Sequence, residues 1–304
     1  MRRPNKGKLM SSTLLVTGAA GKLGQRVIHH LLETYKVAPG RIIAATRSPE
    51  KLADLAAKGV VTRKADFDDA ASLSAAFTGV DRLLIISTDA LAVPGLRLKQ
   101  HTAAVEAAKK AGVKHILYTS MPAPEGSLVS FAPDHLGTEN AIKASGIGYT
   151  ILRDAWYFDN YLHSLPHSLE TGKWYTATGG GRVSNISRED CALAIAAALA
   201  SDTTDNATYT LTGSTAVTIE DVASVVSRIT GRPLEVVQVN DEQFAAGLAG
   251  AGLPPFVVDM LVSADANTRA GKFDILTNDF NKLTGKEPQT LRGFIEEHKA
   301  ALLG

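Results

Sequence analysis

The sequence predicts a doubly wound parallel α/β sheet with a smaller, interleaved α/β lobe toward its C-terminal end. Two observations lead to this prediction. Short apolar runs alternate with helical patterns between residues 14 and 153, as in parallel sheets whose crossover helices cover both faces. In addition, the first apolar run, residues 14–16, leads into a glycine-rich turn and then into a helix whose apolar residues recur at helical spacing.

The glycine-rich turn predicts a dinucleotide site. Gly18 permits a tight bend after the strand, Gly21 lets the backbone approach a pyrophosphate, and Gly24 lets the helix pack close to the strand. The first helical turn then presents unpaired N–H groups to the phosphates. A strand–turn–helix connection without a ligand is the alternative. We therefore expect the sheet around this turn to be a Rossmann domain.

The remaining elements follow in alternation. Further strands of the sheet are predicted at residues 41–46, 60–63, 82–86, 115–119 and 149–153, with helices at 23–35, 98–111 and 134–144. In the second half we predict a capping box at Ser187 to Asp190 that opens a helix, another capped helix from Thr218, short strands near 174 and at 234–239, and a return of 209–211 to the main sheet. We place an NAD(P)-binding domain at 13–153 and a substrate-binding lobe at 154–304, with a soft, interleaved boundary.

The amino-acid composition and net charge are those of a globular protein and give no sign of a nucleic-acid-binding or membrane protein. The chain has 304 residues, 45% of them hydrophobic and 21% charged, as in ordinary globular proteins. A net charge of +1 gives no electrostatic reason to bind nucleic acid or an anionic membrane. The single cysteine, Cys191, excludes an internal disulfide and suits the cytoplasm. Its alanine-rich helical surroundings predict a buried core residue and not a nucleophile.

The first dozen residues carry Arg2, Arg3, Lys6 and Lys8 without an apolar stretch after them, which is not the pattern of a signal peptide. We expect residues 1–12 to be a disordered leader or an added extension, with Met10 as a possible natural start. No apolar stretch in the sequence is long enough to span a bilayer.

Polar residues at the strand ends predict how the nucleotide is bound. Arg47 follows the second strand where NAD-binding domains carry an acid, so the 2′-phosphate of NADPH is the expected partner; a solvated surface arginine is the alternative. Asp66 and Phe67 follow the third strand near the expected adenine, although Asp66 could equally cap the next helix. The fourth strand ends in Ser87, Thr88 and Asp89, at the edge that borders the ligand crevice.

These motifs, with Tyr118-Thr119-Ser120 and the run from Asp134 to Tyr161, resemble the NmrA-like atypical short-chain dehydrogenases, and within them the bacterial quinone reductases and triphenylmethane reductases. The resemblance extends from about residue 13 to near the C-terminus. It implies an NADPH site in which several segments have separate roles. These are Gly18, Ala19, Ala20, Gly21, Lys22 and Leu23 around the pyrophosphate, Arg47 at the 2′-phosphate, Ser87, Thr88 and Asp89 at the ribose and nicotinamide, and Asp154, Ala155, Trp156 and Tyr157 over the nicotinamide.

One departure from the family concerns the chemistry. Most short-chain dehydrogenases carry Tyr-x-x-x-Lys before the sixth strand, and here those positions fall on Phe131 and His135. Reduction of simple ketones is therefore disfavoured, whereas a quinone or a cationic dye accepts hydride directly and takes its proton from water. His135 and Tyr157 are the candidate catalytic residues. His135 could bind ribose or donate a proton, or could be a histidine hydrogen-bonded within its helix.

A second departure concerns the aromatic segment after the sixth strand. The quinone reductases carry Asn where this chain has Asp154, which brings a carboxyl group near the cofactor. Taken alone, Trp156 and Tyr157 would be interpreted as core residues, since large rings usually pack inside; the resemblance favours contact with nicotinamide and a planar substrate. His163 and His167 have helical spacing, but Pro166 is expected to break that segment, so we predict no metal site.

The leading hypothesis is a cytoplasmic NADPH-dependent oxidoreductase, with NADH a weaker donor and with neither metal nor flavin. Its substrate would be a small planar electrophile, either a quinone or a triphenylmethane or azo dye. We expect no nucleic acid or membrane partner, and a monomer or homodimer. The alternative is an NAD(P)-binding redox sensor of the NmrA type that acts on a protein partner without turnover.

Overall fold

The computed structural model describes residues 12–304, so the predictions for the leader, apart from Ser12, lie outside the described residues. The centre of the molecule is a seven-stranded sheet in the order β3-β2-β1-β4-β5-β6-β8, in which every neighbouring pair is parallel. Its strands are β1 (Leu14–Val16), β2 (Ile42–Thr46), β3 (Val61–Lys64), β4 (Arg82–Ile85), β5 (His115–Ser120), β6 (Gly148–Asp154) and β8 (Ala207–Leu211). The predicted fold class is confirmed.

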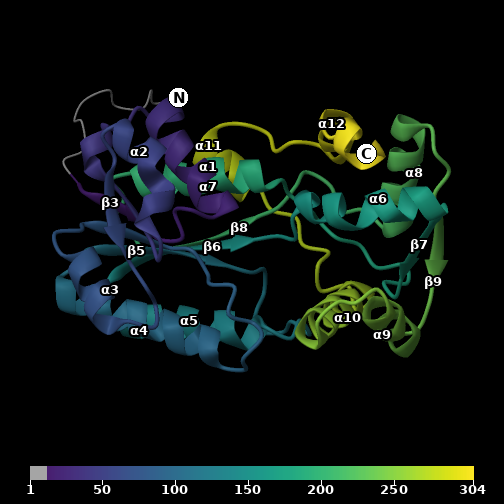
Figure 1. Cartoon of the computed structure of the whole chain (residues 1–304), viewed down its shortest axis with the longest axis horizontal. Coiled ribbons are helices and arrows are strands. Elements are labelled where there is room, and N and C mark those ends of the chain that lie inside the picture. Colours follow the sequence, from purple (N-terminus) through teal and green to yellow (C-terminus); the bar gives the residue numbers. More distant parts are fainter. Residues whose placement is uncertain (1–11) are drawn as a thin grey trace.

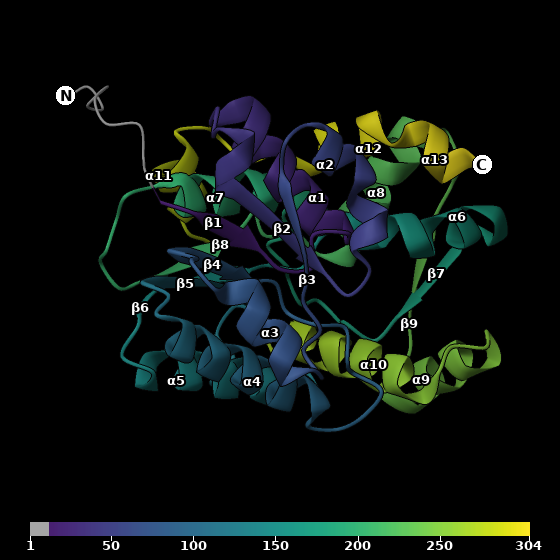
Figure 2. The same ribbon diagram turned by 60° about the vertical axis from the view of Figure 1, so that its left-hand side comes forward.

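Helices cover both faces of this sheet (Figures 1 and 2). One layer contains α3 (Ala70–Phe77), α4 (Leu96–Ala111) and α5 (Ala132–Ala144). The opposite layer contains α1 (Lys22–His29), α2 (Ala53–Ala57), α7 (Arg188–Ala200) and α11 (Asp279–Thr284). Leu14 and Val16 point into the second layer and Leu15 into the first, because successive side chains of a strand alternate between faces. All three are fully buried, which explains the continuous apolar run in the sequence.

The order of the strands determines where a ligand can bind. β1 pairs with β2 on one side and with β4 on the other. Successive strands are therefore added in one direction from β1 to β3 and in the opposite direction from β4 onward, and the order of the strands reverses between β1 and β4. In open α/β sheets, the crevice beyond the carboxyl ends of the strands at this reversal is the usual ligand site. The glycine-rich turn directly follows β1 and therefore lies at this crevice.

The second half of the chain divides its elements between the main sheet and a separate lobe. α7 and β8 join the main sheet, which confirms the predicted return of residues 209–211. The lobe has its own apolar core, built on α6 (Tyr161–Thr171), α8 (Ile219–Thr230), α12 (Leu291–Glu297) and α13 (Lys299–Leu303). A division of the chain at 153/154 stays a prediction.

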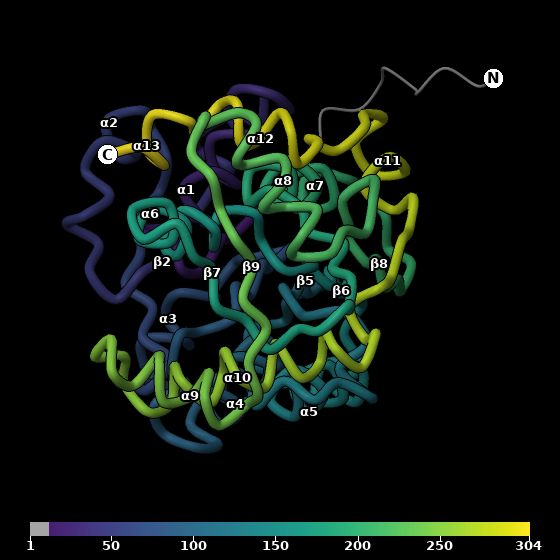
Figure 3. Tube along the Cα trace, turned by 90° about the vertical axis from the view of Figure 1, so that its right-hand side faces the viewer, coloured from purple at the N-terminus to yellow at the C-terminus, as the bar shows by residue number. Residues whose placement is uncertain are grey.

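Two parallel strands, β7 (Lys173–Thr176) and β9 (Glu235–Gln238), run from this lobe toward a helical hairpin, α9 (Asp241–Gly250) and α10 (Pro255–Arg269) (Figure 3). α10 is attached to the loop before α5, because Asn267 Oδ1 accepts hydrogen bonds from the Ser127 hydroxyl at 3.1 Å and from the Leu128 N–H at 2.8 Å. No helix of residues 12–304 has the length and apolar character needed to cross a membrane.

Two local predictions for this half need correction. α6 continues through Pro166 and does not break there, because Leu165 and Leu169 bury its apolar side in the lobe core, which offsets the lost backbone hydrogen bond. Ser187 caps α7 as predicted, yet the box is incomplete: the Asp190 carboxylate accepts from the Ser187 hydroxyl and the Gln289 N–H. Thr218 and Asp221 form the complete capping box at α8.

Candidate functional site

The glycine-rich turn forms a cradle that leaves no room for side chains. Gly18 has φ +60°, in the region that favours glycine, and its carbonyl accepts the Gly21 N–H at 2.9 Å. A Cβ added to Gly24 would lie 2.4 Å from the Gly18 carbonyl oxygen, which is an impossible distance. Gly21 caps α1 without a side-chain hydrogen bond, and the first turn contains no acid. The open N–H groups of that turn therefore fit the pyrophosphate of a dinucleotide.

The ends of β2 and β3 adjoin this cradle. The Ala19 N–H donates to the Ala45 carbonyl at 3.1 Å, which joins the glycine turn to β2 two residues before Arg47. Arg47 is exposed, and no hydrogen bond or ion pair within residues 12–304 engages its guanidinium. Its predicted role at a 2′-phosphate stays a prediction.

The interpretation of Asp66 as a helix cap is wrong. The cap of α3 is Asp69, whose carboxylate accepts the N–H groups of Ala71 and Ser72. The Asp66 carboxylate instead accepts the Asp68 N–H at 3.1 Å, within the turn that follows β3. Asp66 and Phe67 thus lie in the loop at the strand ends, where their predicted contact with adenine is possible.

The segment after β4 is held by hydrogen bonds from three neighbouring elements. The Thr17 hydroxyl accepts the Ile86 N–H at 2.9 Å, and the Thr119 hydroxyl accepts the Ser87 N–H at 2.9 Å. The Thr88 N–H donates to Nε2 of His101, on α4, at 2.9 Å. These bonds place Ser87 and Thr88 at the crevice as predicted, while Asp89 is exposed beside them.

A chain of buried hydrogen bonds links this segment to His135. Because Nε2 of His101 accepts from Thr88, its proton is on Nδ1, which donates to the Thr138 hydroxyl at 2.9 Å. The Tyr118 hydroxyl lies 2.8 Å from Nδ1 of His135 and 3.4 Å from the protonated Nδ1 of His101. The phenol proton therefore goes to His135, whose own proton is on Nε2.

Burial keeps His101 and His135, the two histidines of this hydrogen-bond chain, neutral. Loss of solvation, with a smaller contribution from Arg97, lowers the pKa of His101 to about 3 and that of His135 well below its usual value. His135 therefore has its hydrogen-bond partner on β5 and not within its own helix, and at neutral pH it does not serve as a cationic acid. Its Nε2–H could still meet a ribose hydroxyl. His101 and Tyr118 are not among the predicted site residues. Tyr118 appears only in the family motif, and His101 lies on the buried face of α4 beside two other polar residues, Arg97 and Gln100.

The segment from Asp154 to Tyr157 begins at the last residue of β6, at the carboxyl end of that strand. Tyr157 donates its hydroxyl to Asp154 Oδ2 at 2.9 Å, and Oδ1 of this buried carboxyl has no partner within residues 12–304. Burial raises the pKa of Asp154 to about 7, against the opposing effect of the Tyr157 hydrogen bond. The carboxyl is thus partly protonated near neutral pH. Ala155 is buried and tied to β8 through its N–H.

Trp156 presents a half-buried aromatic surface at the same place. Its ring lies 5.7 Å from the ring of Phe273 and packs, together with Phe131, against an apolar cluster that includes Met121 and Ala264. Tyr157 is packed differently, with the Arg188 guanidinium 5.2 Å above its ring. Trp156 is therefore the better placed of the two to contact a planar ligand.

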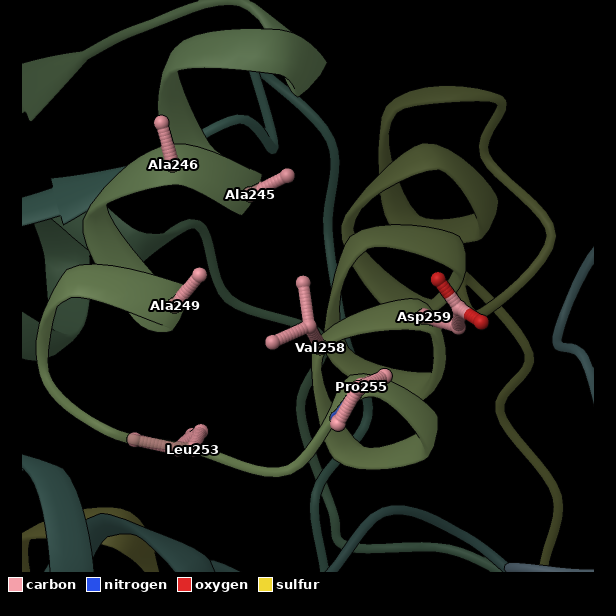
Figure 4. A pocket seen from close by; sticks show the side chains of 7 residues that line it. All are labelled: Ala245, Ala246, Ala249, Leu253, Pro255, Val258 and Asp259. Carbon is pink, nitrogen blue, oxygen red and sulfur yellow. The ribbon is translucent and has the colours of Figure 1, made fainter.

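Other parts of the molecule lie apart from these site residues. An apolar hollow lies within the α9–α10 hairpin, lined by Ala245, Ala246, Ala249, Leu253, Pro255, Val258 and Asp259 (Figure 4). It contains no predicted site residue. Within the described part of the chain, no three His, Cys, Asp or Glu side chains gather so that they could hold a metal ion. Cys191 is fully buried, as predicted, in the α7 side of the core.

Comparison with known proteins places this geometry in context. Residues 10–295 match the model of the NmrA-like family. Quinone oxidoreductase 2 of Escherichia coli (strain K12) is 37% identical over 279 residues, 91% of this chain and 96% of that protein. The solved NADPH complex of an NADPH-dependent quinone oxidoreductase from E. coli has a TM-score of 0.89 at 36% identity, covering 96% of this chain and 100% of that one. Triphenylmethane reductase from Citrobacter sp. has a TM-score of 0.88 at 35% identity, covering 95% and 99%.

Proposed function

We propose, from the premise that this chain belongs to the NmrA-like family, that NADPH is its electron donor and that its acceptor is a quinone or a planar conjugated dye. The family predicted from the residues is confirmed, and the chain is an oxidoreductase of the NAD(P)H:quinone reductase type. A nicotinamide dinucleotide fits the glycine cradle. The absence of a side chain at Gly24, where a Cβ would collide with the backbone, lets α1 lie close to the turn and present its N–H groups to a pyrophosphate. A triphenylmethane or azo dye is the second choice of acceptor.

One observation supports an acceptor that needs no acid from the protein. The start of α5 carries Phe131, which has no ionisable group, and His135, whose imidazole is buried and neutral. A ketone needs a proton at its oxygen as hydride arrives, and neither residue is placed to supply one as a cation. A quinone is electrophilic enough to be reduced first and protonated by water afterwards, and a cationic triphenylmethane dye needs no proton because the hydride neutralises its charge.

Each part of the crevice then has a defined task. A bound nicotinamide supplies the hydride. The open N–H groups of α1 hold the pyrophosphate, and the Arg47 guanidinium pairs with the 2′-phosphate. The Nε2–H of His135 orients the ribose. Trp156, supported by Phe273, provides a flat surface against which a planar acceptor is oriented.

We expect the protein to oxidise NADPH with quinones or dyes and to turn over simple ketones at least about 100-fold more slowly, the scale of a missing general acid. The measurement is the loss of NADPH absorbance with a panel of quinones, triphenylmethane dyes, azo dyes and ketones. Tight NADPH binding without turnover of any panel member would favour the sensor alternative. Fast ketone reduction would show that the protein does supply the proton.

Arg47→Ala should raise the KM for NADPH by tens-fold and leave the KM for NADH nearly unchanged. A charge-assisted contact with the 2′-phosphate contributes about 1.5–3 kcal/mol, and NADH lacks that phosphate. Steady-state kinetics with both donors and one quinone measures the effect. Arg232→Ala, which removes an exposed arginine from the α8–β9 loop, is the matched control and should change neither KM. Equal losses for both donors would mean that Arg47 does not recognise the phosphate.

A further inference from the structure

Arg97 is a buried cation without a partner. It lies in the first turn of α4, directly after the segment that leaves β4 at the crevice, and only 6% of the residue is exposed. Its guanidinium carbon lies 5.1 Å from the centre of the Phe131 ring. Nε is buried without a hydrogen bond, while the two Nη atoms, which have no hydrogen bond or ion pair within residues 12–304, keep contact with solvent.

Two arginines on strands of the sheet have the partners that Arg97 lacks. Arg82, 5% exposed, donates to the carbonyls of Leu199, Thr203 and Ala198 at 3.2, 2.8 and 3.1 Å. Arg153 donates twice to the Glu139 carboxylate. Burying part of a charge without such partners is costly, so a guanidinium with an unpaired buried Nε and two Nη atoms open to solvent points to a group that binds there.

No carboxylate forms an ion pair with Arg97 within the described residues. The two histidines whose pKa values Arg97 helps to lower, His101 and His135, are both neutral. The carboxylates of Asp89 and Asp134 attract the guanidinium, but neither lies within 4 Å of it as an ion pair. The missing partner is therefore an oxygen with negative charge, or one that acquires it.

The position of Arg97 identifies the ligand that would supply this oxygen. The Phe131 ring on which it rests packs against the same apolar cluster as Trp156, the surface proposed for the acceptor. We propose that Arg97 binds an oxygen of the quinone acceptor and stabilises the negative charge that forms on it during reduction. This inference rests on the proposed function.

The reduction balances as follows. A hydride adds to one quinone oxygen and forms an O–H bond, the π electrons shift through the ring so that the electron pair of the other C=O π bond moves onto its oxygen, and the nicotinamide is oxidised. The resulting hydroquinone anion is held by the guanidinium until it takes one proton from water. Arg97 keeps its own proton throughout, because arginine is effectively always charged. With a cationic dye the hydride cancels a positive charge and creates no anion, so Arg97 gives no stabilisation there.

The first test uses binding without turnover. The probe is 4-nitrophenol, added to the protein in the presence of NADP⁺. Its phenolate and neutral forms absorb differently, so the absorbance of the bound probe gives the ratio of the protein's affinities for the two forms. We expect a ratio of at least about 10 for the wild type, as one charge-assisted hydrogen bond provides, and a ratio near one for Arg97→Gln. Arg232→Gln should match the wild type. An unchanged ratio in Arg97→Gln overturns the inference, whether or not the enzyme reduces quinones.

The second test compares acceptors. Arg97→Gln should lower kcat with a quinone by about 10²-fold, the scale of losing one preorganised oxyanion donor, with part of it recovered in Arg97→Lys. It should not lower kcat with a cationic triphenylmethane dye. An unchanged Kd for NADPH and unchanged melting temperature establish that the variant is folded. Equal losses of kcat with quinone and dye, or no loss with either, contradict the inference. A wild type that reduces neither acceptor contradicts the proposed function. In that case the ratio of phenolate to phenol affinity decides the role of Arg97.

Discussion

Gly24→Ala should weaken NADPH binding by at least about 100-fold, the cost of misplacing a binding group by about 1 Å. The added Cβ would lie 2.4 Å from the Gly18 carbonyl oxygen and 2.9 Å from the Ala19 Cα. Both are backbone atoms that cannot rotate away, so α1 must move off the glycine turn. That movement removes the N–H groups of its first turn from the pyrophosphate.

Two glycine variants separate this effect from a general loss of helix or turn quality. Gly40→Ala adds a Cβ with nothing within 4 Å and should leave the Kd for NADPH unchanged. Gly21→Ala meets the Gly18 carbonyl at 3.2 Å and should fall between the two. Kd is measured from tryptophan fluorescence, alongside the melting temperature. A Gly24→Ala protein that melts normally and binds NADPH within about threefold of the wild type would contradict this account of the cradle.

The parts of the fold that were predictable are those with local causes. The glycine turn, the apolar strands and the Thr218 capping box depend on residues within a few positions of each other, so their pattern is visible in the chain. The position of the crevice followed as well, because alternating strands and helices in a right-handed parallel sheet leave their carboxyl ends at one edge.

The parts that could not be predicted depend on contacts between distant segments. One example is the contact of the Tyr118 hydroxyl with the imidazoles of His101 and His135, which lie on three different elements, β5, α4 and α5. No local sequence pattern predicts this contact. The unpaired state of Arg97 is likewise a property of what surrounds it. Pro166 was misjudged for a related reason, since burial of neighbouring leucines outweighs a local helix-breaking tendency.

A second large effect is expected at a buried ion pair beside the crevice. The Glu139 side chain, on α5, has no exposed surface. Its carboxylate accepts from Arg153 Nε at 2.9 Å and Nη2 at 2.8 Å, from the Ser120 hydroxyl at 2.7 Å and from Lys143 Nζ at 3.1 Å. Glu125, half exposed, is the other carboxylate that contacts Arg153. Glu139 thus satisfies donors from β5, α5 and β6 at once.

Glu139→Ala should lower the free energy of unfolding at pH 7 by about 3–5 kcal/mol, because Arg153 then keeps only the half-exposed Glu125 as a partner and the Ser120 hydroxyl loses its acceptor. Glu139→Gln keeps the shape and one acceptor oxygen, so its loss should be smaller. Urea unfolding measures both. Glu296→Gln breaks an exposed pair with Arg292 on α12 and should change stability by less than about 1 kcal/mol. A loss of that small size for Glu139→Ala would mean that Glu125 or water replaces the missing carboxylate.

The same carboxylate gives a pH signature with a definite sign. Burial alone would raise the pKa of Glu139, but the hydrogen bonds from Arg153, Ser120 and Lys143 outweigh it and lower the pKa below its usual value. Its stabilisation is therefore complete above the unfolded-state value, about 4.3, and is lost as the pH falls through the lower folded-state value. The difference in unfolding free energy between wild type and Glu139→Gln should be constant from pH 8 down to about pH 5 and shrink below about pH 4. A difference that grows on acidification would mean that the carboxyl is protonated, and not ionised, in the folded protein.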